Sequence, residues 1–236
     1  DFYALYPPAG SKGRYADMMP MVVLNRSTLP WERSAVDSAD DQHPWLALIC
    51  FSASEEHRNE VALKTIPYKG ITDQALKNAI GSDPGEQMSI LEVPAKAASW
   101  SWLAGKLPGL QELSTHTHVR KSAEEGDGSA LQAVVLGKPI PQTKSDQFYT
   151  VCLVSVEKRY DANGFVKSTD TKTPTQLICL KKWRFFDEEK GLSFIDKAKK
   201  LDYGFLSPPA ITENSPYRQE ANQFLQSGFT PERFQT

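Results

Sequence analysis

The sequence predicts a β-dominated α+β fold with mostly antiparallel sheets and a few peripheral helices. Short runs rich in Val, Ile, Leu and aromatic residues recur along the chain, and turn residues bound most of them. The longest runs carry apolar residues on both alternating faces, which is typical of strands in the middle of a sheet. Only a few segments show the caps and the apolar stripe of an amphipathic helix.

The composition is that of an ordinary globular protein. The chain has 236 residues, enough for one large domain or two small ones. Apolar residues make up 40% of it, so a sizeable core can be buried. Its 27 basic and 29 acidic residues leave a net charge of −2, and this balance argues against nucleic acid or an anionic membrane surface as a partner.

The hydropathy and the ends of the chain bear on its location. No apolar run approaches the roughly 20 residues that cross a bilayer, so no membrane span is expected. No charged segment followed by an apolar one marks a signal peptide, which favours the cytoplasm. Because the chain starts at Asp1 and stops after "FLQSGFTPERFQT", we expect a fragment of a longer protein.

The first half predicts strands over residues 21–26, 45–51 and 60–66. The polar stretch "SASEEHRN" between the last two has the length of a hairpin connection, so these two are expected to form an antiparallel pair. Residues 71–81 predict a helix, with Thr72 as the N-cap and Gly81 just beyond the C-terminus. A further strand is expected over residues 88–93.

The order of these predicted elements divides the chain into four parts, although all of them can belong to one domain. They are an N-terminal β-rich part (1–93), an irregular connection with one short helix (94–112), a β-sheet part with a following helix (113–205), and a linker with a C-terminal helix (206–236). Trp100 and Trp102 lie in the connection. We expect them to cover an edge of the core, and a carbohydrate-binding platform is the alternative.

The clearest β signal lies in the second half. Strands are expected within 131–140, 147–160 and 175–186, with a tight turn at "DANG" (161–164). The centres of the two long strands should pair inside the molecule, with Val151, Leu153 and Val154 opposite Leu177, Ile178 and Leu180. Two helices are predicted after them, over residues 191–204 and 215–228.

The three cysteines are too few for a disulfide framework and predict buried, reduced thiols. Cys50 lies in "ALICF", where burial raises a thiol pKa and opposes a nucleophilic pair with His43 or His57. Cys152 and Cys179 lie in the middle of two strands that are expected to be neighbours. Whether these two form a disulfide is left open by the sequence.

The most suggestive polar pattern is "THTHVRK" (115–121). On a strand, His116 and His118 would face the same side and reach one metal ion, with His43 or His57 as a third ligand. The same alternation also places two imidazoles on a solvated face. We favour that second interpretation, so no metal and no catalytic residue is predicted.

The stretch "LPWER" (29–33) predicts a corner where a strand leaves the core. Leu29 and Trp31 are expected to continue the inward face, and Pro30 cannot donate to a strand ladder. Glu32 and Arg33 should then enter solvent as an exposed ion pair. Because Trp and Arg are typical interface anchors, Trp31, Glu32 and Arg33 are the candidate edge for binding a partner.

Several of these segments together resemble a family of longer bacterial proteins of unassigned function. The likeness is carried by "YPPAGSKGRYADMMPMVVLNRSTLPWER", "PWLALICF", "THVR", "YTVCLVSVE" and "LICLKKWRF", and it extends to "LQSGFTP". Members of the family more often carry a His after the Pro where this chain has "MMPMVVL", which weakens any histidine site near residue 21. The resemblance implies a longer polypeptide and no particular activity.

The sequence therefore favours a non-catalytic structural or protein-interaction module of a larger protein or assembly. Its expected partners are other protein chains or further domains of the same polypeptide, and no cofactor is predicted. Two alternatives from other classes stay open. One is a metal-dependent hydrolase that uses His116 and His118, and the other is a carbohydrate-binding module that uses Trp100 and Trp102.

Overall fold

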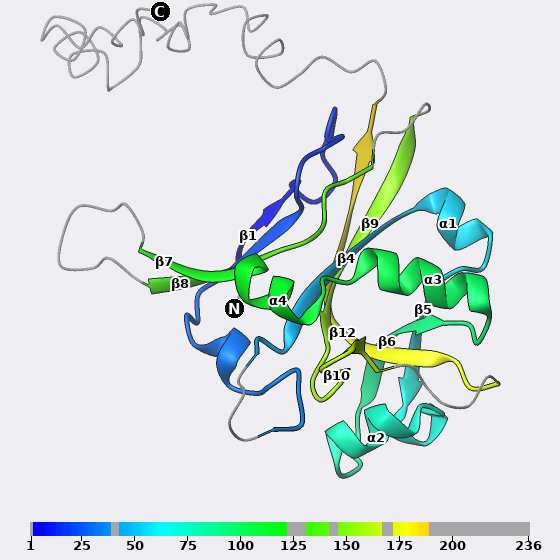
Figure 1. Cartoon of the computed structure of the whole chain (residues 1–236). Helices are drawn as coiled ribbons and strands as arrows, with labels where there is room; N and C mark the ends of the chain where they lie inside the picture. Colours follow the sequence, from blue (N-terminus) through cyan, green and yellow to red (C-terminus); the bar gives the residue numbers. More distant parts are fainter. Residues whose placement is uncertain (1, 39–42, 122–130, 142–145, 167–171, 189–236) are drawn as a thin grey trace, which may run out of the picture. The chain divides into compact units, whose positions relative to one another are not determined.

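The computed structural model of the chain describes residues 2–38, 43–121, 131–141, 146–166 and 172–188 (Figure 1). Contacts divide the chain into a unit of residues 1–195 and a unit of residues 196–236, and the second unit lies outside the described residues. The helices predicted over 191–204 and 215–228 also lie outside them. Within the first unit, two β-sheets and a small hairpin form the framework of the fold.

The small sheet combines strands from separate parts of the chain. Its antiparallel order is β1-β3-β8-β7, formed by Phe2–Tyr6, Met21–Leu24, Leu131–Leu136 and Thr117–Lys121. The central strands β3 and β8 are rich in valine and almost wholly buried, as their apolar sequences predict.

The large sheet holds the long strands of the second half. Its antiparallel order is β4-β9-β12-β6-β5, formed by Leu46–Ser52, Gln147–Ser155, Thr175–Asp187, Gln87–Val93 and Ala62–Pro67. The short strand β2 (Lys12–Gly13) pairs in parallel with the end of β12. The predicted β-dominated, mostly antiparallel α+β fold is confirmed.

Strand β12 changes partner along its length. Its residues 175–178 pair with β6 and its residues from Cys179 onward pair with β9, with a register shift between Cys179 and Lys181 at the start of that second half. The pairing of β9 with β12 was expected, but Leu177 and Ile178 lie opposite β6 instead of β9. Leu180, expected inside, lies at the irregularity and is 42% exposed. A bulge turns the side chain out of the regular alternation.

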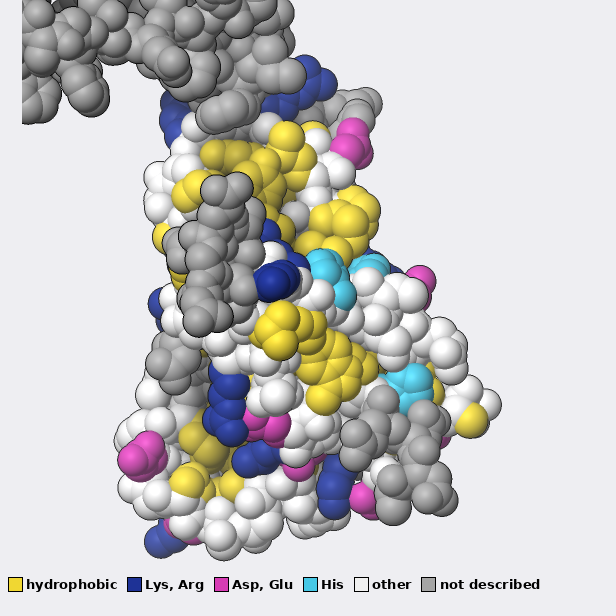
Figure 2. All heavy atoms as spheres, turned by 90° about the vertical axis from the view of Figure 1, so that its left-hand side faces the viewer, with side chains coloured by type: hydrophobic (Ala, Val, Ile, Leu, Met, Phe, Trp, Pro, Cys, Tyr) yellow, Lys and Arg dark blue, Asp and Glu magenta, His cyan; other side chains and the backbone are white. Residues whose placement is uncertain are grey.

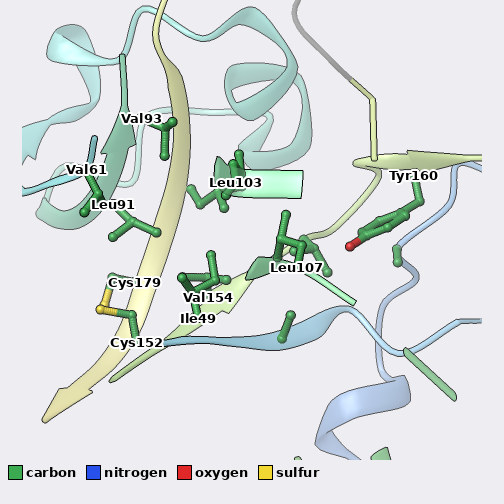
Figure 3. Packing of buried hydrophobic residues seen from close by; sticks show 14 of the residues in the cluster. Ile49, Val61, Leu91, Val93, Leu103, Leu107, Cys152, Val154, Tyr160 and Cys179 are labelled. Atoms are coloured by element: carbon green, nitrogen blue, oxygen red, sulfur yellow. The ribbon is translucent and has the colours of Figure 1, made fainter. Parts of the chain in front are cut away.

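The large sheet is covered on both faces (Figure 1). One face of β4, β9 and β12 packs on the small sheet through alternate residues such as Leu48, Val151 and Phe185. The opposite face packs under helices, and Figure 3 shows Leu103 and Leu107 in one cluster with Ile49 and Val154. Because side chains alternate along a strand, successive residues of β4 belong to two different hydrophobic cores.

Short helices complete the described part. They are α1 (Ala53–His57), α2 (Gln74–Ile80), α3 (Ala97–Lys106) and α4 (Leu110–His116), with 3₁₀ turns at Leu29–Trp31 and Tyr68–Gly70. Two of these helices correct the sequence prediction. The stretch 110–116 is helical where an irregular crossing was expected. Helix α2 is capped by the carboxylate of Asp73, which accepts bonds from Ala75 and Leu76, and not by Thr72.

The predicted hairpin between residues 45–51 and 60–66 was wrong. Strand β4 pairs with β9, and β5 pairs with β6. The intervening segment holds α1, because the Ser52 side chain caps the amide of Glu55 while the Glu55 carboxylate accepts from the Ser52 amide. A helix in place of a turn carries the chain away from β4.

The tight turn at "DANG" is confirmed. The two strands β10 (Tyr160–Asp161) and β11 (Gly164–Phe165) form a small hairpin, and Gly164 takes a positive φ of 114°. This backbone region is open to glycine and strained for other residues. None of the helices within the described residues has the length and apolar content that crossing a bilayer requires.

Candidate functional site

The predicted corner is a 3₁₀ turn and not the continuation of a strand. Strand β3 ends at Leu24, and Leu29–Trp31 form the turn, with Pro30 buried. Trp45 fixes it, because its indole Nε1 donates to the Leu29 carbonyl at 2.7 Å and its amide donates to the Pro30 carbonyl at 3.0 Å. Leu29 and Trp31 still pack against the core between the sheets. The 3₁₀ turn, and not the alternation of a strand, directs their side chains there.

Glu32 and Arg33 are both exposed, and each has a partner. The Glu32 carboxylate pairs with Arg26 at 2.6 Å and accepts from the Thr28 hydroxyl at 2.7 Å. Arg33 donates to Glu157 at 2.7 Å and stacks over the Trp45 ring, with its Cζ 5.3 Å from the ring centroid. The Arg33 side chain is 55% exposed and that of Glu157 is 15% exposed, so the surface presents the guanidinium.

Beside Arg33 and Trp45 the surface is hollowed into a pocket of about 190 Å³, which we call the corner pocket. Helix α2, the end of β9 and the first half of β12 form its walls. The apolar lining consists of Leu76, Ala79, Ile80, Leu177, Ile178 and Leu180. Its polar lining comes from Arg33, Ser155, Glu157 and Arg159. Of the candidate edge Trp31–Glu32–Arg33, only Arg33 contributes to this lining among the described residues.

Arg159 belongs to a buried polar cluster under the corner pocket. Its Nη1 donates to Asp73 at 3.0 Å, and both side chains are 2% exposed. The same Nη1 reaches the Gln176 carbonyl at 3.4 Å, and the guanidinium lies 5.1 Å from the Phe165 ring centroid. Arg159 Nε has no hydrogen-bond partner among the described residues. A buried charge of this kind is stable only with its counter-charge in place.

Gln176 connects this cluster to the start of α2. Its side-chain oxygen accepts from the amides of Thr72 and Asp73 at 2.8 and 3.1 Å, and its Nε2 donates to Glu92 at 2.9 Å. The Gln176 amide donates to the second Asp73 oxygen at 3.0 Å. Apart from Arg159 Nε, the polar groups on the floor of the corner pocket bond to one another, which favours a rigid floor.

The histidine pair does not share a strand. His116 is the last residue of α4, and His118 lies on β7, so alternation does not bring the two rings to one side. His43 lies elsewhere, 3.2 Å from the Ser114 hydroxyl through Nδ1. Within the described ranges, no group of three or more His, Cys, Asp or Glu residues is arranged to hold a metal ion.

Both tryptophans of the connection pack on the core edge, as expected. Trp100 lies 5.6 Å from Phe165 between ring centroids, and Trp102 meets Phe51 edge-on at 6.2 Å. Trp102 also donates its indole N–H to Glu55 at 2.7 Å. The two rings thus serve different neighbours and do not form one flat platform.

The cysteines are free, buried thiols. Burial raises the pKa of the Cys50 thiol to about 12, the direction that the sequence predicted. Figure 3 shows Cys152 and Cys179 side by side, and both are free thiols. Their mutual hydrogen bond, followed by burial, raises the pKa of the Cys152 thiol. The same hydrogen bond lowers the pKa of the Cys179 thiol. All three cysteines are buried, so none has the exposure of a reactive cysteine.

The polar residues on the floor of the corner pocket were not recognised as a site from the sequence. Arg159, Asp73 and Gln176 come from distant segments and belong to no recognised motif, so only the fold brings them together. A scan of protein-family models, a search of curated proteins and a search of solved structures each found no match to this chain. The resemblance to longer bacterial proteins stays a prediction, and function is inferred below from the residues of the chain itself.

Proposed function

We propose that the protein is a non-catalytic interaction module that binds a segment of another protein chain at the corner pocket. The segment presents one bulky apolar side chain to the pocket and an acidic side chain to Arg33. The observation that carries this proposal is a small, rigid, largely apolar pocket beside an exposed guanidinium. Trp45, which holds the 3₁₀ turn, forms part of the same wall.

The size of the corner pocket favours a single side chain as its occupant. An apolar cavity of about 150 Å³ accommodates a benzene ring, and sites for small-molecule ligands usually measure about 300–1,000 Å³. At about 190 Å³ the corner pocket suits one Phe, Leu or Met side chain. Protein interfaces concentrate binding energy in anchors of this kind, which fill a desolvated pocket.

The charges around the corner favour an acidic neighbour to that anchor. In both ion pairs of the corner the arginine is more exposed than its carboxylate, with 55% against 15% for Arg33–Glu157 and 64% against 28% for Arg26–Glu32. An exposed pair of this kind is worth only about 0–1 kcal/mol, so a partner carboxylate can join or replace the internal one at little cost. On the face drawn in Figure 2, Lys and Arg side chains lie between hydrophobic patches.

Short fluorescent peptides of a Gly-Ser background test this proposal with the full chain. Each peptide carries one anchor (Phe, Leu, Ser or Lys) next to one charged residue (Asp or Lys), and fluorescence anisotropy measures its affinity. We expect Phe-Asp and Leu-Asp peptides to bind most tightly. Arg33→Glu should reverse the preference from Asp to Lys beside the same anchor, because it reverses the charge at the rim.

Helix α2 provides a matched pair of variants. Ala79→Leu fills the corner pocket, and Ala75→Leu adds the same side chain at an exposed position of that helix outside the pocket. Binding should be lost in the first variant and kept in the second. If the peptides bind Ala79→Leu as tightly as wild type, or show no preference for an apolar anchor, the corner pocket is not the docking site.

A further inference from the structure

A second cavity lies on a different part of the fold, between α3, β4 and the segment that follows β8. It measures about 390 Å³, and we call it the helix pocket. Its described lining consists of Cys50 and Ser101, Trp102, Gly105 and Lys106 of α3, and Lys138, Pro139 and Pro141. Nothing in this cavity takes part in the docking site proposed above.

The helix pocket contains more donors than acceptors. Lys106 binds Glu55 at 2.8 Å, with side-chain exposures of 18% and 13%. The Glu55 carboxylate is already occupied, because one oxygen accepts from Trp102 and Lys106 while the other accepts from the Ser52 amide and hydroxyl. An ammonium offers three donors, so Lys106 retains two beyond this bond.

Lys138 adds a second positive charge to the same cavity. Within the described residues it forms no ion pair, and its charge acts on Glu112. The amide of Gly109 is the main cause of the lowered pKa of the Glu112 carboxyl, and the charge of Lys138 contributes less. Two lysines thus line one cavity, and no carboxylate belongs to its described lining. Glu55, the carboxylate that binds Lys106, is already occupied.

Three apolar rings line the cavity beside Cys50, Ser101 and Gly105. The indole of Trp102 and the pyrrolidines of Pro139 and Pro141 line the cavity, and proline offers no backbone N–H to a ligand. The volume of about 390 Å³ is twice that of the corner pocket and falls within the usual range for small-molecule sites. Flat apolar surface next to surplus cationic donors is complementary to an organic anion with an aromatic body.

We propose that the helix pocket is a binding site for a small aromatic anion, whose ring lies against Trp102, Pro139 and Pro141 and whose carboxylate or sulfonate binds Lys138 and Lys106. The site is independent of the docking proposal, because no residue is shared between the two cavities. Its specificity resides in Lys138, since Lys106 is also needed by Glu55.

The test uses 1-naphthoate and its neutral isostere 1-naphthamide, titrated into the full chain and followed by NMR. Wild type should bind naphthoate roughly tenfold or more tightly than naphthamide, because a charge-assisted hydrogen bond contributes about that factor. Lys138→Gln should remove this preference and leave naphthamide affinity unchanged within about twofold, and Lys138→Arg should restore it. Lys96→Gln, at the exposed start of α3 and outside the cavity, is the control and should bind as wild type does.

A second variant tests whether the compounds bind in the helix pocket, independently of the charge of Lys138. No atom lies within 4 Å of a Cβ built on Gly105, so Gly105→Leu can enter the cavity without disturbing the helix. It should abolish binding of both compounds, whereas Ala104→Leu on the exposed face should not. The proposal is overturned if naphthoate fails to bind wild type at millimolar concentration, if naphthamide binds as tightly, or if Gly105→Leu binds normally.

Discussion

The corner pocket and the helix pocket share a motif and use it differently. Each has a cation over a tryptophan, Arg33 at 5.3 Å from the Trp45 ring and Lys106 at 5.7 Å from the Trp102 ring. Arg33 is 55% exposed and pairs at the surface, whereas Lys106 is 18% exposed and holds a buried carboxylate. The cation over the tryptophan is thus accessible to a partner at the corner pocket, whereas at the helix pocket it is held in an internal ion pair.

The two cavities also differ in what supports them. On the floor of the corner pocket lies a buried ion pair, Arg159–Asp73, in which the two charges balance each other, and the rest of the lining is largely apolar. The lining of the helix pocket contains two lysines and no carboxylate among the described residues; Glu55 binds the lining residues Lys106 and Trp102 without belonging to the lining itself. We infer that internal pairing of charge favours an apolar anchor, while unbalanced charge favours an anion.

The largest effect is expected at the floor of the corner pocket. Arg159→Ala leaves Asp73 buried without its counter-charge and should lower the free energy of unfolding by about 3–5 kcal/mol. Arg33→Ala, which breaks the exposed pair with Glu157, should cost at most about 1 kcal/mol. Urea denaturation of both variants measures the difference. Equal losses of unfolding free energy in the two variants would mean that the Arg159 pair on the floor is not more strongly stabilising than the Arg33 pair at the rim.

The helix pocket should respond to loss of its buried carboxylate. Glu55→Gln weakens bonds from Lys106, Ser52 and Trp102 and should lower the free energy of unfolding by about 1–3 kcal/mol at neutral pH. Glu56→Gln is the matched control on the same helix, since the Glu56 side chain is 43% exposed and lies 3.8 Å from Arg184. A loss in the control that equals the loss at Glu55 would refute a special role for the buried carboxylate.

The effect of Glu55→Gln should depend on pH. Burial alone would raise the pKa of Glu55, but the bonds from Lys106, Ser52 and Trp102 outweigh it and lower that pKa from its ordinary 4.5. A carboxyl whose pKa is lower in the folded protein than in the unfolded chain stabilises the fold at pH values above the unfolded pKa. This stabilisation is lost as the pH falls through the folded pKa. The gap between wild type and Glu55→Gln should therefore narrow below about pH 4.5. If the stability difference between wild type and Glu55→Gln stayed constant in acid, the lowered pKa of Glu55 would be contradicted.

Cys50, at the floor of the helix pocket, predicts a smaller effect in alkali. Its pKa rises from 9.0 to about 12 on folding, so the unfolded chain loses this proton first as the pH increases. Stability from this group is complete below pH 9.0 and falls by about 1.4 kcal/mol per pH unit above it. Cys50→Ala should show a shallower decline in denaturation midpoint between pH 9 and pH 10.5. Parallel slopes for the two proteins would count against a buried thiol.

The smallest effects concern two glycines with open surroundings. Gly105 lies inside α3, so Gly105→Ala should stabilise the protein by about 0.5–1 kcal/mol through helix propensity. Gly81 ends α2 with a φ of +80°, so Gly81→Ala should destabilise by about 1 kcal/mol. Thermal unfolding of both variants resolves the opposite signs. The same sign in both would show that the wall of the helix pocket is not a regular helix.

Local sequence patterns predicted much of the fold. The strands at residues 88–93, 131–136 and 147–155 follow from apolar runs and turn residues, and the "DANG" turn follows from its Asn-Gly pair. The partner of β4 was missed because the polar stretch after it was interpreted by its length alone. "SASE" already contains the Ser and Glu of a capping box, which indicates a helix start.

The candidate sites were less accessible to sequence. Arg33 was identified through the "LPWER" corner, since Pro and Trp mark a break in a strand. Arg159 binds a carboxylate 86 positions away in the chain, and no periodicity encodes such a pairing. The separation of His116 from His118 was missed because α4 extends to His116, and a seven-residue helix in a stretch with Pro and Gly nearby gives a weak signal.

The most direct test of two cavities with different occupants is a crossed binding measurement. Ala79→Leu and Gly105→Leu are each assayed with the Phe-Asp peptide and with 1-naphthoate. We expect Ala79→Leu to lose only the peptide and Gly105→Leu to lose only naphthoate, each with the other affinity unchanged within about twofold. If either variant loses both ligands, or if both variants keep both, the two pockets do not have the separate roles assigned to them.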